Sequence, residues 1–250
     1  MKTYLLIPVL ALLAPTAWAL PLSFDNTLIN LVGGVNLDDR ANSALLMNNF
    51  AESNPPANLP FSGESLAISD SGSIAFAFAG AADAGSLITT TEIAMDLLGI
   101  DQFASADATA QFSGNFTTLT GATRLILDFE NIATSAGANA TTLTELFFSI
   151  ANSNNDILLM ENFAFPGIGG LQQTIERTFA LATGMSATLE LALFSVTTSD
   201  FGGMASQLAT VNFQLETVAT QAVPEPSSLL LAGLGLWGIA VRRRDMLHRV

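Results

Sequence analysis

The clearest fold signal in the chain is VNFQLE at residues 211–216, in which every second residue is large and apolar. Val211, Phe213 and Leu215 would lie on one face of an extended strand, with their polar neighbours on the other. This period-two pattern predicts a strand in an antiparallel sheet that has one packed face and one wet face. TLELAL at residues 188–193 repeats the pattern, and RLILDFE at residues 124–130 follows it with a single break.

Turn-forming residues separate further candidate strands. In residues 66–78, DSGS at positions 70–73 divides two halves in which large apolar side chains alternate with small or polar ones. The polar cluster NSNND at residues 152–156 lies between apolar stretches at residues 143–150 and 157–163. This arrangement predicts a hairpin with a five-residue loop.

These patterns predict an all-β fold class, an antiparallel β-sandwich of jelly-roll-like form. Strand patterns never alternate regularly with helical ones, which disfavours a parallel α/β sheet. Residues 41–51 and 92–103 could each form a short helix. The length suits a single sandwich over residues 20–222.

The N-terminal segment has the three parts of a secretory signal peptide. Lys2 precedes an apolar run over residues 5–14, and Ala17 and Ala19 flank Trp18 as an A-x-A site. We expect export through the Sec translocon and cleavage by signal peptidase after Ala19. Residues 1–19 are therefore expected to lie outside the folded domain.

The C-terminal segment, residues 223–250, combines a short motif, an apolar run and a basic tail. Its parts are the motif Val223, Pro224, Glu225 and Pro226, the run at residues 227–241, and the cluster Arg242, Arg243 and Arg244 within the tail at residues 242–250. We expect the run to form a transmembrane helix, because lipid-facing backbone must satisfy its own hydrogen bonds. Its 15 residues would span roughly 22 Å, against about 30 Å of hydrocarbon. The arginines would stay cytoplasmic and leave residues 20–222 outside.

This order of parts resembles the PEP-CTERM sorting signal of exported bacterial proteins, a cassette also called the ice-binding protein C-terminal domain. The resemblance covers residues 223–244 and the signal peptide. It implies that Pro224, Glu225 and Pro226 are recognised by an exosortase, a membrane-embedded cysteine transpeptidase that removes the tail. It also implies transient anchoring in the inner membrane, then transfer to the cell envelope or extracellular matrix, in a setting of exopolysaccharide and biofilm. Residues 245–250 run past the arginines, a small departure from the pattern.

The domain between these ends is acidic and lacks most catalytic side chains. Residues 20–222 contain no Lys, Tyr, Trp, His or Cys, and three arginines stand against 20 acidic residues, a net side-chain charge of −17. This charge argues against nucleic acid as a partner, because phosphate neutralisation needs clustered Lys and Arg. Without His, Lys, Tyr or Cys, neither a Ser-His-Asp triad nor a His-based zinc site can form. We therefore predict a non-enzymatic domain with no cofactor.

Paired acids leave two alternatives open. A carboxylate-based glycosidase would need a pair such as Asp38 with Asp39, or Asp128 with Glu130. Asp128 and Glu130 are, however, expected to share the wet face of one strand without any function. Structural calcium could use Asp38 and Asp39 or the oxygen-rich cluster at residues 152–156, although neither has EF-hand spacing.

A third alternative is a lectin-like carbohydrate-binding module. Sugar sites commonly stack a ring on Trp or Tyr, and this domain has neither, so a platform would need an exposed Phe. Most phenylalanines fall at positions expected to face the core. Phe201, beside Gly202 and Gly203, is the one expected in a loop.

The leading hypothesis is an exported, non-enzymatic surface or matrix protein associated with exopolysaccharide. An acidic surface would also attract divalent cations that could bridge it to anionic polysaccharide. A carbohydrate-binding module is the alternative, and a glycosidase ranks below both.

Overall fold

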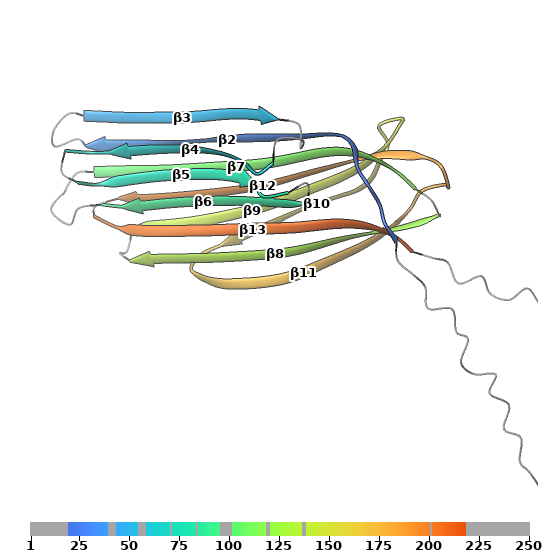
Figure 1. Ribbon diagram of the computed structural model, residues 1–250. Coiled ribbons are helices and arrows are strands. Elements are labelled where there is room, and N and C mark those ends of the chain that lie inside the picture. The colour runs from blue at the N-terminus through green and yellow to red at the C-terminus, as the bar shows by residue number, and fades with distance from the viewer. Residues whose placement is uncertain are drawn as a thin grey trace, which may run out of the picture. The chain divides into compact units, whose positions relative to one another are not determined.

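Two antiparallel sheets packed face to face make up the fold (Figure 1). The computed structural model describes residues 20–39, 44–54, 59–70, 72–83, 85–95, 102–118, 121–136, 139–200 and 202–218. The described chain is all-β and forms two antiparallel sheets, which confirms the predicted antiparallel β-sandwich.

Seven strands build one sheet and six build the other. The seven-stranded sheet has the order β11 (Gly169–Ala180), β8 (Ala122–Ala136), β13 (Met204–Thr217), β6 (Ser86–Ala94), β5 (Ile74–Ala81) and β4 (Phe61–Ile68), with β1 (Leu20–Pro21) paired to β13. The six-stranded sheet has the order β10 (Ile157–Pro166), β9 (Ala140–Asn152), β12 (Ser186–Asp200), β7 (Gln102–Thr117), β2 (Asp25–Asp39) and β3 (Ala44–Asn54).

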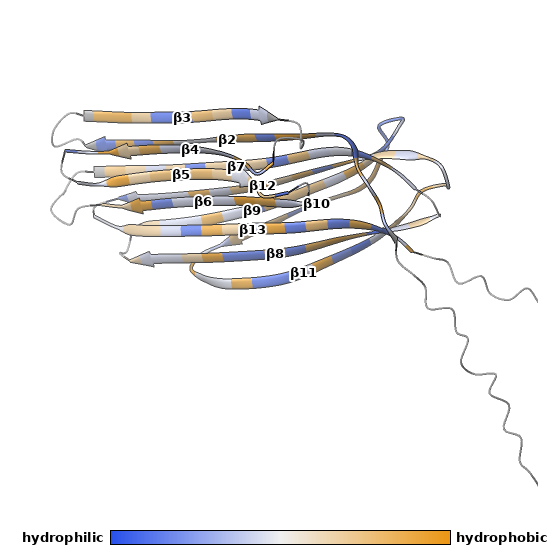
Figure 2. Cartoon of the chain, in the orientation of Figure 1, coloured by the Kyte–Doolittle hydropathy of each residue, from blue (hydrophilic) through white to orange (hydrophobic). Residues whose placement is uncertain are grey.

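The alternation that predicted strands also sets which side chains are buried. Val211, Phe213 and Leu215 of β13 are buried, whereas Asn212 and Gln214 between them are exposed. Apolar and polar residues alternate along β13 in Figure 2 as well. The sandwich therefore buries one face of each sheet, and its core lies between the sheets.

In β4 and β5 the buried face is the opposite of the expected one. Ala75 and Ala77 are fully buried, whereas Leu66 and Ile68 are 47% and 55% exposed. The reason lies in β7, which contacts β5 across the core and presents a row of buried alanines at positions 104, 106, 108 and 110. Alanine facing alanine leaves room only for small side chains, so the larger residues of β4 and β5 point outward.

Part of the core is polar, which the sequence did not suggest. The hydroxyl of Thr89 in β6 hydrogen-bonds that of Ser195 in β12 at 2.7 Å, and Thr91 hydrogen-bonds Thr197 at 2.6 Å. All four side chains are buried. These pairs join the two sheets by hydrogen bonds as well as by apolar packing.

Both hairpins are confirmed, and the expected helices are wrong in the described residues. β4 and β5 pair across the turn that begins at Ser69, and β9 pairs with β10. Residues 44–51 lie in β3, which pairs with β2 along its whole length, so cross-strand bonding overrides the local helical pattern. Of residues 92–103, the described ones belong to β6, the residue after it, and β7.

Residues 20–218 fold as one unit with its own core. Every strand pairing in the described chain, and every residue of the core, falls within this segment. The short strand β1 pairs Leu20 with Thr217 and Pro21 with Glu216, so the first and last strands of the unit meet at one end.

Candidate functional site

The expected sorting residues lie outside the described part of the chain. These are Ala17 and Ala19 at the N-terminal side and Val223, Pro224, Glu225, Pro226, Arg242, Arg243 and Arg244 at the C-terminal side. Among the described residues, none belongs to a helix with the length and apolarity that crossing a membrane requires.

One candidate acid pair, Asp128 with Glu130, lines a hollow of about 380 Å³ on the outer face of the seven-stranded sheet. Asp128 and Glu130 are exposed on the outer face of β8, as expected for one strand, and Asp128 Oδ1 accepts a hydrogen bond from Thr174 at 2.7 Å. Asp38 is half-buried in β2, and the side chain of Asp39 is outside the described part. Within the described ranges, no three acidic or histidine side chains gather as a metal site would require.

The oxygen-rich cluster at residues 152–156 uses its side chains to build its own turn. Asn152 Oδ1 accepts hydrogen bonds from the backbone N–H groups of Asn154 and Asp156 at 2.9 and 3.0 Å. Its amide nitrogen donates to the Asp156 carboxylate at 2.9 Å. Asn155 has φ = 64°, a left-handed conformation that Asn tolerates. Turn formation therefore accounts for this cluster.

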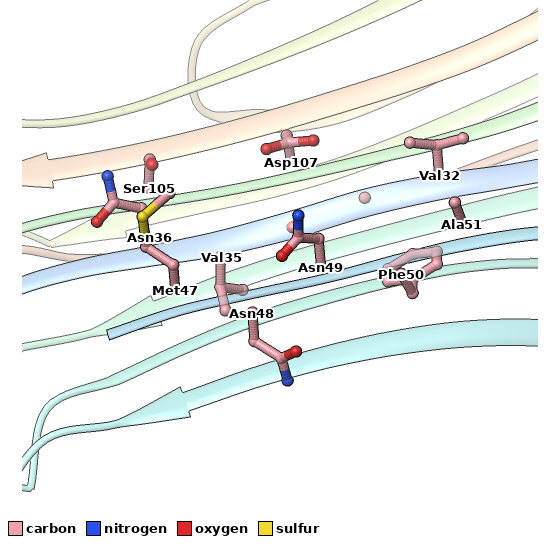
Figure 3. Close-up of a pocket in the computed structure, with 12 residues that line it drawn as sticks. Val32, Val35, Asn36, Met47, Asn48, Asn49, Phe50, Ala51, Ser105 and Asp107 are labelled. Atoms are coloured by element: carbon pink, nitrogen blue, oxygen red, sulfur yellow. The ribbon is translucent and has the colours of Figure 1, made fainter. Parts of the chain in front are cut away.

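A broad, open hollow lies on the outer face of the six-stranded sheet, over β2, β3 and β7. We call it the Gly34 hollow, and it encloses about 610 Å³. Figure 3 shows Asn36, Met47 and Ser105 near one end, Asp107 and Asn49 in the middle, and Val32 and Ala51 at the other end. Its outward-facing lining residues are Val32, Gly34, Asn36, Met47, Asn49, Ala51, Ser105 and Asp107.

A missing side chain forms the floor of this hollow. Gly34 pairs with Asp107 on one side and with Asn49 on the other. A Cβ at Gly34 would lie 3.3 Å from the Asn48 carbonyl oxygen, so the backbone there would have to shift by a few tenths of an ångström, and the rest of the side chain would rise into the hollow. Gly33 serves packing instead, because a Cβ there would lie 2.7 Å from the Phe50 ring.

Two polar groups of the Gly34 hollow are fully or partly removed from water. The side-chain oxygen of Asn36 is buried and has no hydrogen-bond partner. Partial burial raises the pKa of the Asp107 carboxyl above its usual range, because desolvation disfavours the charged form. The half-buried Asp107 carboxylate is an acceptor that a ligand's hydroxyl or amide donors can reach.

A second, smaller hollow of about 240 Å³ lies on the same face, over β7 and β12. We call it the Phe147 hollow after the half-buried ring from β9 at its rim. Polar side chains from three strands surround it, namely Asn30, Gln111, Ser113 and Glu190. Ala192 pairs directly with Phe147, so a small side chain flanks one edge of the ring.

The exposed-Phe candidate Phe201 lies outside the described residues, and sequence analysis missed Phe147 and Phe194. Both rings are half-buried and face outward from the six-stranded sheet. The period-two alternation of buried and exposed residues in the sequence could have identified both rings as outward-facing. Phe147 precedes the fully buried Phe148, and Phe194 follows the fully buried Leu193, so alternation alone places each on the outer face.

The two described arginines are on the seven-stranded sheet, and both are paired with glutamates. Arg124 on β8 donates to Glu216 at 2.7 Å, and this hydrogen bond raises the pKa of its guanidinium. Arg177 on β11 donates twice to Glu161 of β10, at 2.6 and 2.7 Å, which raises its pKa likewise. Among the described residues, the lining of both hollows includes carboxylates and no cation.

The comparison with protein families confirms the expected sorting signal. The PEP-CTERM protein-sorting motif matches residues 222–244, which include the V-P-E-P motif and the three arginines. This motif implies an exported protein that an exosortase processes at the membrane. No curated protein matches the chain.

Solved structures with a similar fold include carbohydrate-binding domains. The TmCBM61 domain, solved with β-1,4-galactotriose, is 10% identical, with 52% of this chain and 69% of that chain covered and a TM-score of 0.25. The CBM36-1 domain of a xylanase from the hindgut metagenome of Trinervitermes trinervoides is 17% identical, with 45% and 78% covered and a TM-score of 0.24. The N-terminal cellulose-binding domain of a Cellulomonas fimi glucanase is 11% identical, with 64% and 90% covered and a TM-score of 0.25. These similarities concern the all-β architecture alone.

Proposed function

We propose that this chain is an exported, non-enzymatic protein of the cell surface or extracellular matrix, sorted by exosortase, whose sandwich binds matrix polysaccharide. The outer face of the six-stranded sheet carries the proposal. There, two neighbouring hollows are lined by amide, hydroxyl and carboxylate groups, and half-buried Phe rings stand among them.

This combination suits a sugar better than an apolar ligand. A pyranose ring presents an apolar face to an aromatic side chain and a rim of hydroxyls to polar groups. Amides donate and accept hydrogen bonds, and carboxylates accept them, so Gln111, Asn30 and Glu190 can satisfy hydroxyls of either polarity. Both hollows are open at the surface, which admits a polymer as well as a small sugar.

The spacing of acids on this face disfavours glycoside hydrolysis. Glu190 pairs with Ser113, which is six residues from Asp107 along β7, so the two carboxyls are separated by roughly 20 Å at about 3.3 Å per residue. Glycosidases place their two carboxyls within about 9.5 Å. On the other sheet, Asp128 and Glu130 line a separate hollow and are two residues apart on β8, roughly 7 Å at about 3.3 Å per residue, so only an assay for released sugar separates binding from cleavage there. The separation of Glu190 and Asp107 supports binding without cleavage on the six-stranded sheet.

Affinity electrophoresis tests the proposal. Residues 20–218, the unit with its own core, are run in native gels cast with and without exopolysaccharide from the native host. We expect retardation in the polysaccharide gel relative to a reference protein, and no release of reducing sugar on prolonged incubation. Equal mobility in both gels would contradict polysaccharide binding, and released sugar would contradict the non-enzymatic assignment.

A further inference from the structure

We infer that the Gly34 hollow and the Phe147 hollow are subsites of one groove that takes a segment of an uncharged polysaccharide chain. This inference rests on the proposed function and assigns its site and ligand class.

The two hollows adjoin each other on one face. Asn30 lines the Phe147 hollow and Val32 lines the Gly34 hollow, and these residues are two apart on β2, so both point outward. Between the hollows, Val32, Thr109 and Phe194 stand side by side in register on three adjacent strands. A ligand leaving one hollow therefore crosses this row and enters the other.

The length of the groove exceeds a single sugar. Asp107 in one hollow and Gln111 in the other are four residues apart on β7, about 13 Å at 3.3 Å per residue. A monosaccharide could occupy one hollow only. A linear oligosaccharide could contact both, so each added ring would bring new contacts until the groove is filled.

The charges of the face select against acidic polymers. Asp107 lies in one hollow and Glu190 in the other, and Glu145 stands outward beside Phe194. The two described arginines are already paired on β8 and β11. Uronate or sulfate groups would meet repulsion here, whereas uncharged hydroxyls can donate to the carboxylates of Asp107 and Glu190.

The same host exopolysaccharide, separated by anion exchange into neutral and acidic fractions, tests the ligand class. In gels containing EDTA, we expect the neutral fraction to retard residues 20–218 and the acidic fraction to leave their mobility unchanged. Retardation by the acidic fraction alone would overturn this inference while leaving the proposed function intact. Retardation in acidic gels only after calcium is added would instead support cation bridging, and would overturn the inference equally. No retardation by either fraction would overturn both.

Two variants test whether the hollows form one groove. Phe147→Ala removes the ring of one hollow, and Gly34→Val fills the floor of the other. We expect each to weaken binding of the neutral fraction about tenfold, the equivalent of about 1.4 kcal/mol. Phe76→Ala is the matched control, because Phe76 is a half-buried outward ring on the seven-stranded sheet.

Thermal unfolding of each variant checks that the fold is retained. Calorimetric titration with neutral oligosaccharides of increasing length separates one groove from two sites. A single groove predicts affinity that rises with chain length and falls in either variant at unchanged stoichiometry. Half the stoichiometry at unchanged affinity would mean independent sites and would overturn the inference.

Discussion

At Asp107, the stability of the domain and the binding of a ligand are expected to favour different side chains. Burial raises the pKa of the Asp107 carboxyl above the ordinary 3.8, because the folded state favours the protonated form. The stabilisation that the protonated form provides is present at pH below 3.8 and is lost as the pH rises through the raised pKa. At pH 7 the ionised carboxyl therefore costs stability. We expect Asp107→Asn to stabilise the domain at pH 7, by less than about 1 kcal/mol because solvent still screens the group. The gain should shrink as pH falls toward 3.8.

Urea unfolding at pH 7 and at about pH 4.5 measures this difference. Glu64→Gln is the control, because Glu64 is exposed on β4 and away from both hollows. Asp107→Asn should at the same time weaken retardation by neutral polysaccharide, because the amide is a poorer acceptor than the carboxylate. Stabilisation together with weaker binding is the pattern expected of a binding residue. A variant that loses stability at pH 7 would contradict the assigned cost.

At this scale, alternation predicted some residues well and placed others wrongly. The buried and exposed sides of residues 211–216 follow directly from period two. The buried side of residues 74–79 does not, because it depends on the alanines of β7 that face them from the other sheet. A sequence pattern identifies two faces of a strand, and only the partner sheet determines which of them is packed.

The strands β6 and β12 are linked across the core by paired hydroxyls. Thr91→Val should leave the Thr197 hydroxyl buried without a partner, at a cost of about 1–3 kcal/mol, and Thr197→Val should do the same to Thr91. The double variant removes both polar groups and keeps the shape, so its cost should fall below about 1 kcal/mol. Urea unfolding of the four proteins completes the cycle. Simple additivity of the two single costs would contradict the pairing.

Element type was predictable wherever the period was long and clean, and elsewhere tertiary pairing decided it. Residues 44–51 have a mixed pattern that also fits a helix, yet they extend along β2 as an edge strand. The groove was harder to predict than the strands. It combines Gly34 of β2, Asp107 of β7 and Phe147 of β9, whose register across the sheet no local pattern contains.

At the scale of the whole molecule, we expect the signal peptide and the sorting segment to be removed and the sandwich to remain intact. β1 begins at Leu20 and pairs with the end of β13, so signal cleavage after Ala19 would leave every described strand intact. The sorting motif matches residues 222–244, which follow the last strand. We therefore predict that intact mass measured on protein from the native host gives a chain that starts at Leu20 and ends within residues 223–226, allowing for an added group.

Two variants test whether processing depends on the V-P-E-P motif. Each removes one acidic side chain that follows the sandwich in the sequence, so the second variant is a matched control for the first. Glu225→Ala changes the V-P-E-P motif and should accumulate as a longer chain in the membrane fraction. Asp245→Ala lies past the three arginines and should be processed as the unaltered protein is. An unaltered protein that still ends at Val250 in the membrane fraction would contradict the prediction. The apolar run would then be a permanent anchor, and the groove would act at the membrane surface rather than in a released matrix.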